Sequence, residues 1–124
     1  MFFLFLKAYW KLIVFELDVR QGSFEILYGR VRNCPIEDVI APPGTIERVC
    51  SAIDLASIWY WREIPCLQRS AATTCLLREY GIAAQMVIGA QQVPFKAHAW
   101  VEVDGRVVND KPYTSEIYCA LDRC

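Results

Sequence analysis

The stretch AHAWVEVDGRVVND, residues 97–110, decides the fold. Residues typical of strands, such as Trp100, Val101, Val107 and Val108, lie on both sides of Asp104 and Gly105, and an Asp-Gly pair favours a tight turn between antiparallel strands. We therefore expect a β-hairpin here. The preceding segment IAAQMVIGA, residues 82–90, is predicted to be a further strand, with Gly89 near its end. No pattern places the tail from Pro112 to Cys124.

Helical patterns come before these strands. Residues 2–20 predict a first helix that Gly22 can end, and Thr45 opens a second helix that stops at Pro65. A third helix is expected over residues 66–81, with Gly81 as its left-handed cap. Residues 23–31 are ambiguous between strand and helix, with irregular or helical structure favoured, and the proline-rich residues 33–45 form a connector. Helices followed by strands predict an α+β fold, with N-terminal helices packed against a small antiparallel sheet.

Length and charge restrict the class of protein. The 124 residues suit a single domain, which we divide into an N-terminal helical region that can dock a partner, residues 1–44, and a core that contains the candidate site residues, residues 45–124. The net charge of −1 and the scattered basic residues argue against nucleic-acid binding. The apolar start is interrupted by Lys7 and Lys11, which makes it too short for a membrane span, and it lacks the charge order of a secretion signal. The helix over residues 2–20 is expected to be mostly buried or to expose apolar surface that a partner protein binds. Membrane contact is disfavoured.

Six cysteines are present, at positions 34, 50, 66, 75, 119 and 124. Without an export signal, a cytoplasmic location with free thiols is expected. The sequence contains neither a Cys-x-x-Cys pair nor a second histidine, so no metal and no cofactor is expected.

Cys66 is the thiol with a distinctive setting. It follows Pro65 directly and is expected in the first turn of a helix, where the positive end of the helix dipole stabilises a thiolate and free backbone N–H groups can bind an oxyanion. The alternative is that the thiol only fills space as a small hydrophobe, which is what we expect of Cys75.

The only histidine, His98, lies on the first strand of the hairpin. A two-residue turn at Asp104 and Gly105 would put Asp110 on the opposite face of the sheet from His98. A three-residue loop, Val103 to Gly105, would put Asp110 directly across from His98, within hydrogen-bonding reach. We expect the three-residue loop, with Asp110 orienting His98. Two other acids, Glu102 and Asp104, are expected to be solvated.

These residues carry a resemblance. PCLQRSAATTCLLREYGIAAQMVIGA followed by PFKAHAWVEVDGRVVND resembles the transglutaminase-like peptidases of lasso-peptide biosynthesis, in the form where the peptidase is a separate chain from its leader-binding partner. The similarity covers roughly residues 60–110 and rests on Cys-Leu-x-Arg, on Gly-Ile after the helix, and on Phe-x-x-His-Ala-Trp-Val-Glu-Val with a following Asp.

The resemblance implies a papain-like or transglutaminase-like core with a catalytic triad of Cys66, His98 and Asp110. It also implies removal of the leader from a ribosomally made precursor peptide, the substrate, with a small leader-recognition protein acting in trans and an ATP-dependent cyclase acting afterwards. Two alternatives remain open: acyl transfer to an amine rather than to water, and a non-catalytic scaffold that presents its N-terminal helix.

The second donor to the oxyanion is left open. Gln68 is expected to point away from the site, and the indoles of Trp59 and Trp61 can reach it only if they are not core residues. For Trp100, three roles are open: shielding the imidazole of His98, lining the substrate groove, or ordinary packing.

Overall fold

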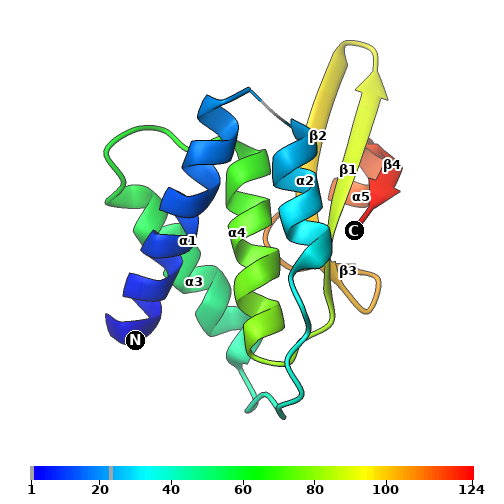
Figure 1. Ribbon diagram of the computed structural model, residues 1–124. Coiled ribbons are helices and arrows are strands. Elements are labelled where there is room, and N and C mark those ends of the chain that lie inside the picture. Colours follow the sequence, from blue (N-terminus) through cyan, green and yellow to red (C-terminus); the bar gives the residue numbers. More distant parts are fainter. Residues whose placement is uncertain (1, 23) are drawn as a thin grey trace.

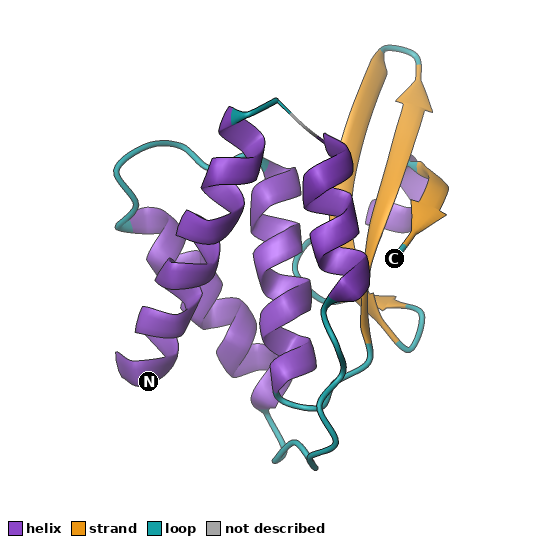
Figure 2. Ribbon diagram, viewed as in Figure 1, coloured by secondary structure: helices purple, strands orange, loops and turns teal. Residues whose placement is uncertain are grey.

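The computed structural model describes residues 2–22 and 24–124 and shows two layers. The long helices occupy one side of the molecule, and the strands, together with one short helix, occupy the other (Figures 1 and 2). In chain order, the elements are α1 (Phe2–Arg20), α2 (Phe24–Asn33), α3 (Thr45–Ile58), α4 (Cys66–Glu79), β1 (Ala84–Gln92), β2 (Phe95–Val103), β3 (Arg106–Val107), α5 (Thr114–Ile117) and β4 (Cys119–Arg123). The expected α+β fold, with helices against a small antiparallel sheet, is confirmed.

Helix α4 lies at the centre. It contacts α1, α2 and α3 and also both long strands, and its residues 70–78 are all buried. Pro65 precedes it in an extended conformation, and the Pro65 carbonyl accepts the first helical hydrogen bond, from the N–H of Arg69 at 3.1 Å. At the other end, Gly81 has φ +83°, and a Cβ there would collide with the Val39 carbonyl of the connector. Proline and glycine thus fix both ends of the helix that carries Cys66.

Helix α1 turns its polar residues inward. Lys11 Nζ lies 2.7 Å from Glu79 Oε2, and the buried Glu16 accepts hydrogen bonds from the Tyr60 hydroxyl at 3.1 Å and from Arg62 Nε at 3.1 Å. Burial opposes the charge of Glu16, but its hydrogen bonds outweigh this effect, and the pKa of the carboxyl lies below its ordinary value. Several apolar residues of α1 are exposed instead: Phe2, Phe3, Leu6, Trp10 and Leu17. No helix among residues 2–22 and 24–124 is long and apolar enough to cross a membrane.

The ambiguous segment before the connector is helical, as favoured: α2 packs on α1 and α4. At its end, Cys34 forms a disulfide with Cys75 of α4, with a Cα–Cα distance of 5.8 Å. The expectation that all thiols are free is therefore wrong for these two. Sequence spacing did not reveal the pair because the two cysteines are 41 positions apart, and only the packing of α2 on α4 brings them together.

The sheet has the order β3-β2-β1-β4, and every pairing is antiparallel. The unplaced tail supplies the short helix α5 and the edge strand β4, which pairs with β1. One hydrophobic core joins the layers; it includes Leu12 of α1, Leu76 of α4 and Val101 of β2, all fully buried. The same core thus contains side chains from both regions that the sequence analysis separated at residue 44.

Candidate active site

Cys66 and His98 line one cavity between α4 and the sheet. This cavity of about 190 Å³ is also lined by Leu67, Ile88 and Ala99. The packing of α4 across β1 and β2 brings the first turn of the helix to the middle of β2, where His98 lies. The thiol and the imidazole, 32 positions apart in the sequence, therefore face the same space.

His98 and Asp110 form a direct contact. The His98 Nε2 lies 2.6 Å from Asp110 Oδ2, and the second carboxylate oxygen of Asp110 accepts a hydrogen bond from the Lys111 N–H at 2.8 Å. Partial burial opposes the charge of Asp110, but the bonds to His98 and to the Lys111 N–H prevail, and the pKa of this carboxyl lies below its ordinary value. Because Nε2 is occupied by the carboxylate, Nδ1 is the ring nitrogen left for the thiol.

The route to this contact differs from the predicted one. Val103 pairs with Arg106 and Glu102 with Val107, so the turn consists of Asp104 and Gly105 alone, with φ values of 52° and 76°. The expected three-residue loop is wrong, because both turn residues adopt the left-handed conformation of a two-residue hairpin. Asp110 still reaches His98 because β3 ends at Val107 and the chain then leaves the ladder, so strand alternation no longer sets the direction of the carboxylate.

A polar bracket holds the segment that carries Asp110. The side chain of the neighbouring Asn109 accepts a hydrogen bond from the Val101 N–H at 2.8 Å and donates to Ser70 Oγ at 3.0 Å. Ser70 Oγ in turn donates to the Ala99 carbonyl at 3.1 Å. These bonds tie α4, β2 and the loop together, four residues after Cys66 and one before Asp110. No sequence pattern singled out Ser70 or Asn109; their only signal is proximity to the candidate triad.

Aromatic rings surround the imidazole. The ring centroid of Tyr118 lies 4.9 Å from that of His98, and the Trp100 centroid lies 6.0 Å from it. Trp100 is fully buried, and it packs so closely over β1 that a Cβ on Gly89 would lie 2.5 Å from its ring. Trp100 therefore supports His98 from the core, and it does not line the cavity. Tyr118 belongs to the tail that no sequence pattern placed.

Glu102 corrects another expectation. It is buried, not solvated: it accepts a hydrogen bond from Trp100 Nε1 at 2.8 Å and forms an ion pair with Arg123. Arg123 lies on β4, 21 positions away, so the sequence around Glu102 carries no sign of this partner. Asp104 is exposed in the turn, as expected.

The three residues considered as second oxyanion donors do not line the cavity. Gln68 is fully buried on the other side of α4 and donates to the Leu12 carbonyl at 2.8 Å, which confirms that it points away. Trp59 and Trp61 are largely exposed; the Trp61 ring packs against Tyr60 and lies near Arg20.

Two of the other free thiols, those of Cys50 and Cys124, lie away from the imidazole. Burial, together with the nearby charges of Asp54 and Glu47, raises the pKa of Cys50 to about 11, and its thiol donates to the Val108 carbonyl. Burial also raises the pKa of Cys124. Neither residue lines the cavity beside His98. In the described part of the chain, no group of three or more His, Cys, Asp or Glu side chains is placed to hold a metal ion.

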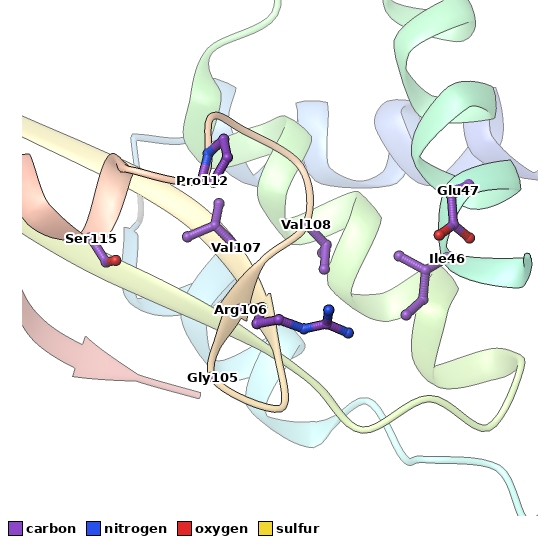
Figure 3. Close-up of a pocket in the computed structure, with 8 residues that line it drawn as sticks. All are labelled: Ile46, Glu47, Gly105, Arg106, Val107, Val108, Pro112 and Ser115. Atoms are coloured by element: carbon purple, nitrogen blue, oxygen red, sulfur yellow. The ribbon is translucent and has the colours of Figure 1, made fainter.

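A larger cavity of about 470 Å³ lies elsewhere, between the start of α3 and the segment after the hairpin turn (Figure 3). Ile46, Val108 and Pro112 contribute to its walls, and Arg106 extends across it toward α3. Neither a thiol nor an imidazole lines it. The smaller cavity is therefore the one with the chemistry of a nucleophile and a base.

Comparison with known proteins gives two matches. The family model described as the transglutaminase-like superfamily matches residues 10–121. The microcin J25-processing protein McjB of Escherichia coli is 47% identical over 47 residues, which are 38% of this chain and 23% of that protein. The matched segment thus spans about a quarter of the relative's length. No solved structure matches.

Proposed function

Because the chain belongs to the transglutaminase-like superfamily, we propose that it is a cysteine endopeptidase that removes the leader from a ribosomally made lasso-peptide precursor. The observation that carries the proposal is a thiol at the start of α4 that shares a cavity with an imidazole bonded to a carboxylate. The partial similarity to a protein named for processing microcin J25 supports the choice of substrate.

In the proposed mechanism, His98 takes the proton of Cys66, and the thiolate attacks the carbonyl carbon of the cleaved bond. The carbonyl oxygen becomes an oxyanion at the N-terminus of α4, where free backbone N–H groups stabilise it. When the C–N bond breaks, His98 gives its proton to the leaving amine, and the leader remains on Cys66 as a thioester. Water, activated by His98, then releases the leader as a free acid and restores the thiol.

Asp110 orients the ring in this scheme. Its bond to Nε2 fixes the tautomer and stabilises the imidazolium that forms after proton transfer. Tyr118 and Trp100 restrict rotation of the ring, and the bracket formed by Asn109 and Ser70 holds the segment that carries the carboxylate.

The proposed partners are the precursor, a separate leader-recognition protein that binds in trans, and a cyclase that acts on the new amine; the proposed location is the cytoplasm. An apolar hollow of about 510 Å³, lined by Phe2, Phe5, Leu55 and Trp59, lies between α1 and α3. We propose that the leader-recognition protein binds there, because these side chains leave apolar surface exposed.

The test is cleavage of a precursor in the presence of the leader-recognition protein, followed by mass spectrometry. A leader that ends in a free carboxylate is the expected product, and Cys66→Ala is expected to abolish it. A leader joined to an amine would indicate acyl transfer instead. If the Cys66→Ala variant processed the precursor at the parent rate, Cys66 would catalyse neither hydrolysis nor acyl transfer. The non-catalytic scaffold would then be the remaining hypothesis.

A further inference from the structure

The cavity beside Cys66 is apolar apart from the reacting groups. Its other lining residues are Phe24, Leu67, Ile88, Ala97 and Ala99. Two of these are alanines on β2, so the strand leaves open space beside the thiol that larger side chains would fill. A substrate bound to Cys66 must therefore place one of its groups in a space with apolar walls.

Charge inside this cavity would be costly. None of the lining residues is Lys, Arg, Asp or Glu. Two carboxylates of this part of the molecule are engaged: Asp110 is bonded to the imidazole, and Glu102 is paired with Arg123. The lining residues would give a charged substrate side chain no ionic partner in return for its lost water, whereas an aliphatic side chain would gain by leaving water.

One wall comes from α2, far along the chain from the helix that carries Cys66. Phe24 is the first residue of α2, and its ring stacks on Tyr28 with centroids 5.4 Å apart. The Tyr28 hydroxyl donates to the Arg123 carbonyl at 3.2 Å, which links this end of α2 to β4. These contacts hold Phe24 in place. The size of the cavity on this side is therefore set by a side chain that is not part of the candidate triad.

We propose that this cavity is a specificity subsite for one uncharged, aliphatic side chain in the acyl part of the peptide, next to the cleaved bond, and that Phe24 sets its upper size. The acyl part is chosen because it stays bonded to sulfur after the amine has left, so its side chain is beside these walls in both halves of the reaction. The inference rests on the proposed function, since it takes Cys66 as the nucleophile.

The test uses acetyl-dipeptide chloromethyl ketones, which alkylate an activated thiol from the acyl side and require no partner protein. One position at a time is varied among glycine, valine, leucine, tryptophan, aspartate and lysine, and the rate at Cys66 is measured by peptide mapping. At one position, valine or leucine is expected to react at least about tenfold faster than aspartate, lysine or tryptophan.

Two variants change the size of the subsite in opposite directions. Phe24→Ala is expected to raise the rate with tryptophan relative to leucine by about fivefold or more. Ala97→Val adds bulk at an exposed strand position that accepts a β-branched residue, and it is expected to shift the preference toward glycine. The matched control is Phe95→Ala, since Phe95 is an exposed phenylalanine on the same strand that does not line the cavity; it is expected to leave all ratios unchanged.

The outcomes separate the two proposals. If Cys66 reacts no faster than the exposed Cys119 with every probe, the thiol is not activated and the proposed function fails. If Cys66 reacts fast but equally with aliphatic, aromatic and charged probes, or if neither variant alters the ratios, the subsite is overturned while the peptidase proposal stands.

Discussion

The carboxylate of Asp110 reaches His98 from outside the ladder of the sheet. The two side chains are 2.6 Å apart at their nearest atoms, although β3, which precedes Asp110, pairs with β2 over only two residues. The Lys111 N–H donates a hydrogen bond to the carboxylate, and the side chain of the neighbouring Asn109 anchors the segment that carries it by accepting from the Val101 N–H. The side chains of His98 and Asp110 are 22% and 31% exposed, so the pair is open to a substrate and still shielded enough to interact.

Asp110→Asn is expected to lower the rate of precursor cleavage by roughly 10²–10⁴-fold. An amide keeps the shape of the carboxylate but does not stabilise an imidazolium or fix the tautomer as a charge does. The measurement is kcat/KM for leader removal. Asp104→Asn is the matched control, because Asp104 is an exposed acid of the same hairpin, and it is expected to be unchanged. Equal rates for Asp110→Asn and the parent would exclude the orienting role.

The lowered pKa of Asp110 predicts a pH dependence of stability. A carboxyl whose pKa is lower in the folded state releases its proton more readily there, so its contribution to stability is present above the unfolded pKa of about 3.9 and is lost as the pH falls through the folded value. The parent is therefore expected to lose more stability than Asp110→Asn as the pH falls below about 4. Urea unfolding at a series of pH values from 6 to 2.5 measures the difference. Parallel curves for the two proteins would contradict the prediction.

Gly89 is required by the packing of Trp100. A Cβ at Gly89 would lie 2.5 Å from the Trp100 ring, which is fully buried and cannot move without disturbing the stack on His98. Gly89→Ala is expected to destabilise the fold by about 1–3 kcal/mol and to slow cleavage.

The control for Gly89→Ala is Gly29→Ala in α2. A Cβ there meets nothing within 4 Å, so this change is expected to stabilise the helix by about 0.5–1 kcal/mol. Thermal unfolding measures both variants. A Gly89→Ala protein as stable as the parent would show that Trp100 has room to shift.

Local pattern was enough to predict much of the fold. The order of helices and strands followed from apolar spacing and from Pro65, Gly81 and the Asp-Gly pair, since these act over a few residues. Three features could not be predicted because they depend on distant partners: the Cys34–Cys75 disulfide, the Glu102–Arg123 pair and the ring of Tyr118 on His98. The predicted three-residue loop was wrong because strand register was taken as the sole means of joining His98 to Asp110, whereas the short β3 frees Asp110 from the register.

Reduction of the Cys34–Cys75 disulfide is expected to destabilise the protein. The bond closes a loop across 41 positions. Its loss raises the entropy of the unfolded chain, which lowers the free energy of unfolding by up to about 4 kcal/mol. Denaturant unfolding with and without reductant measures the change. Reductant is preferred to substitution, because Cys75 is 2% exposed and a smaller residue would also leave a cavity. Differential alkylation must first show that both thiols are blocked; free thiols in the purified, unreduced protein would contradict the pairing.

The exposed aromatic residues of the helical layer predict a partner interface. Trp10 and Trp59 are 63% and 70% exposed, and Trp59 lines the apolar hollow between α1 and α3. Trp10→Ser and Trp59→Ser are each expected to weaken binding of the leader-recognition protein by about tenfold or more, because an aromatic side chain buried at an interface often contributes over 1 kcal/mol. Neither change is expected to lower stability or the rate at which small probes alkylate Cys66. Val93→Ser, at a 92% exposed apolar position in the β1–β2 turn, is the control. Calorimetric affinities that are equal for all three variants and the parent would place the interface elsewhere.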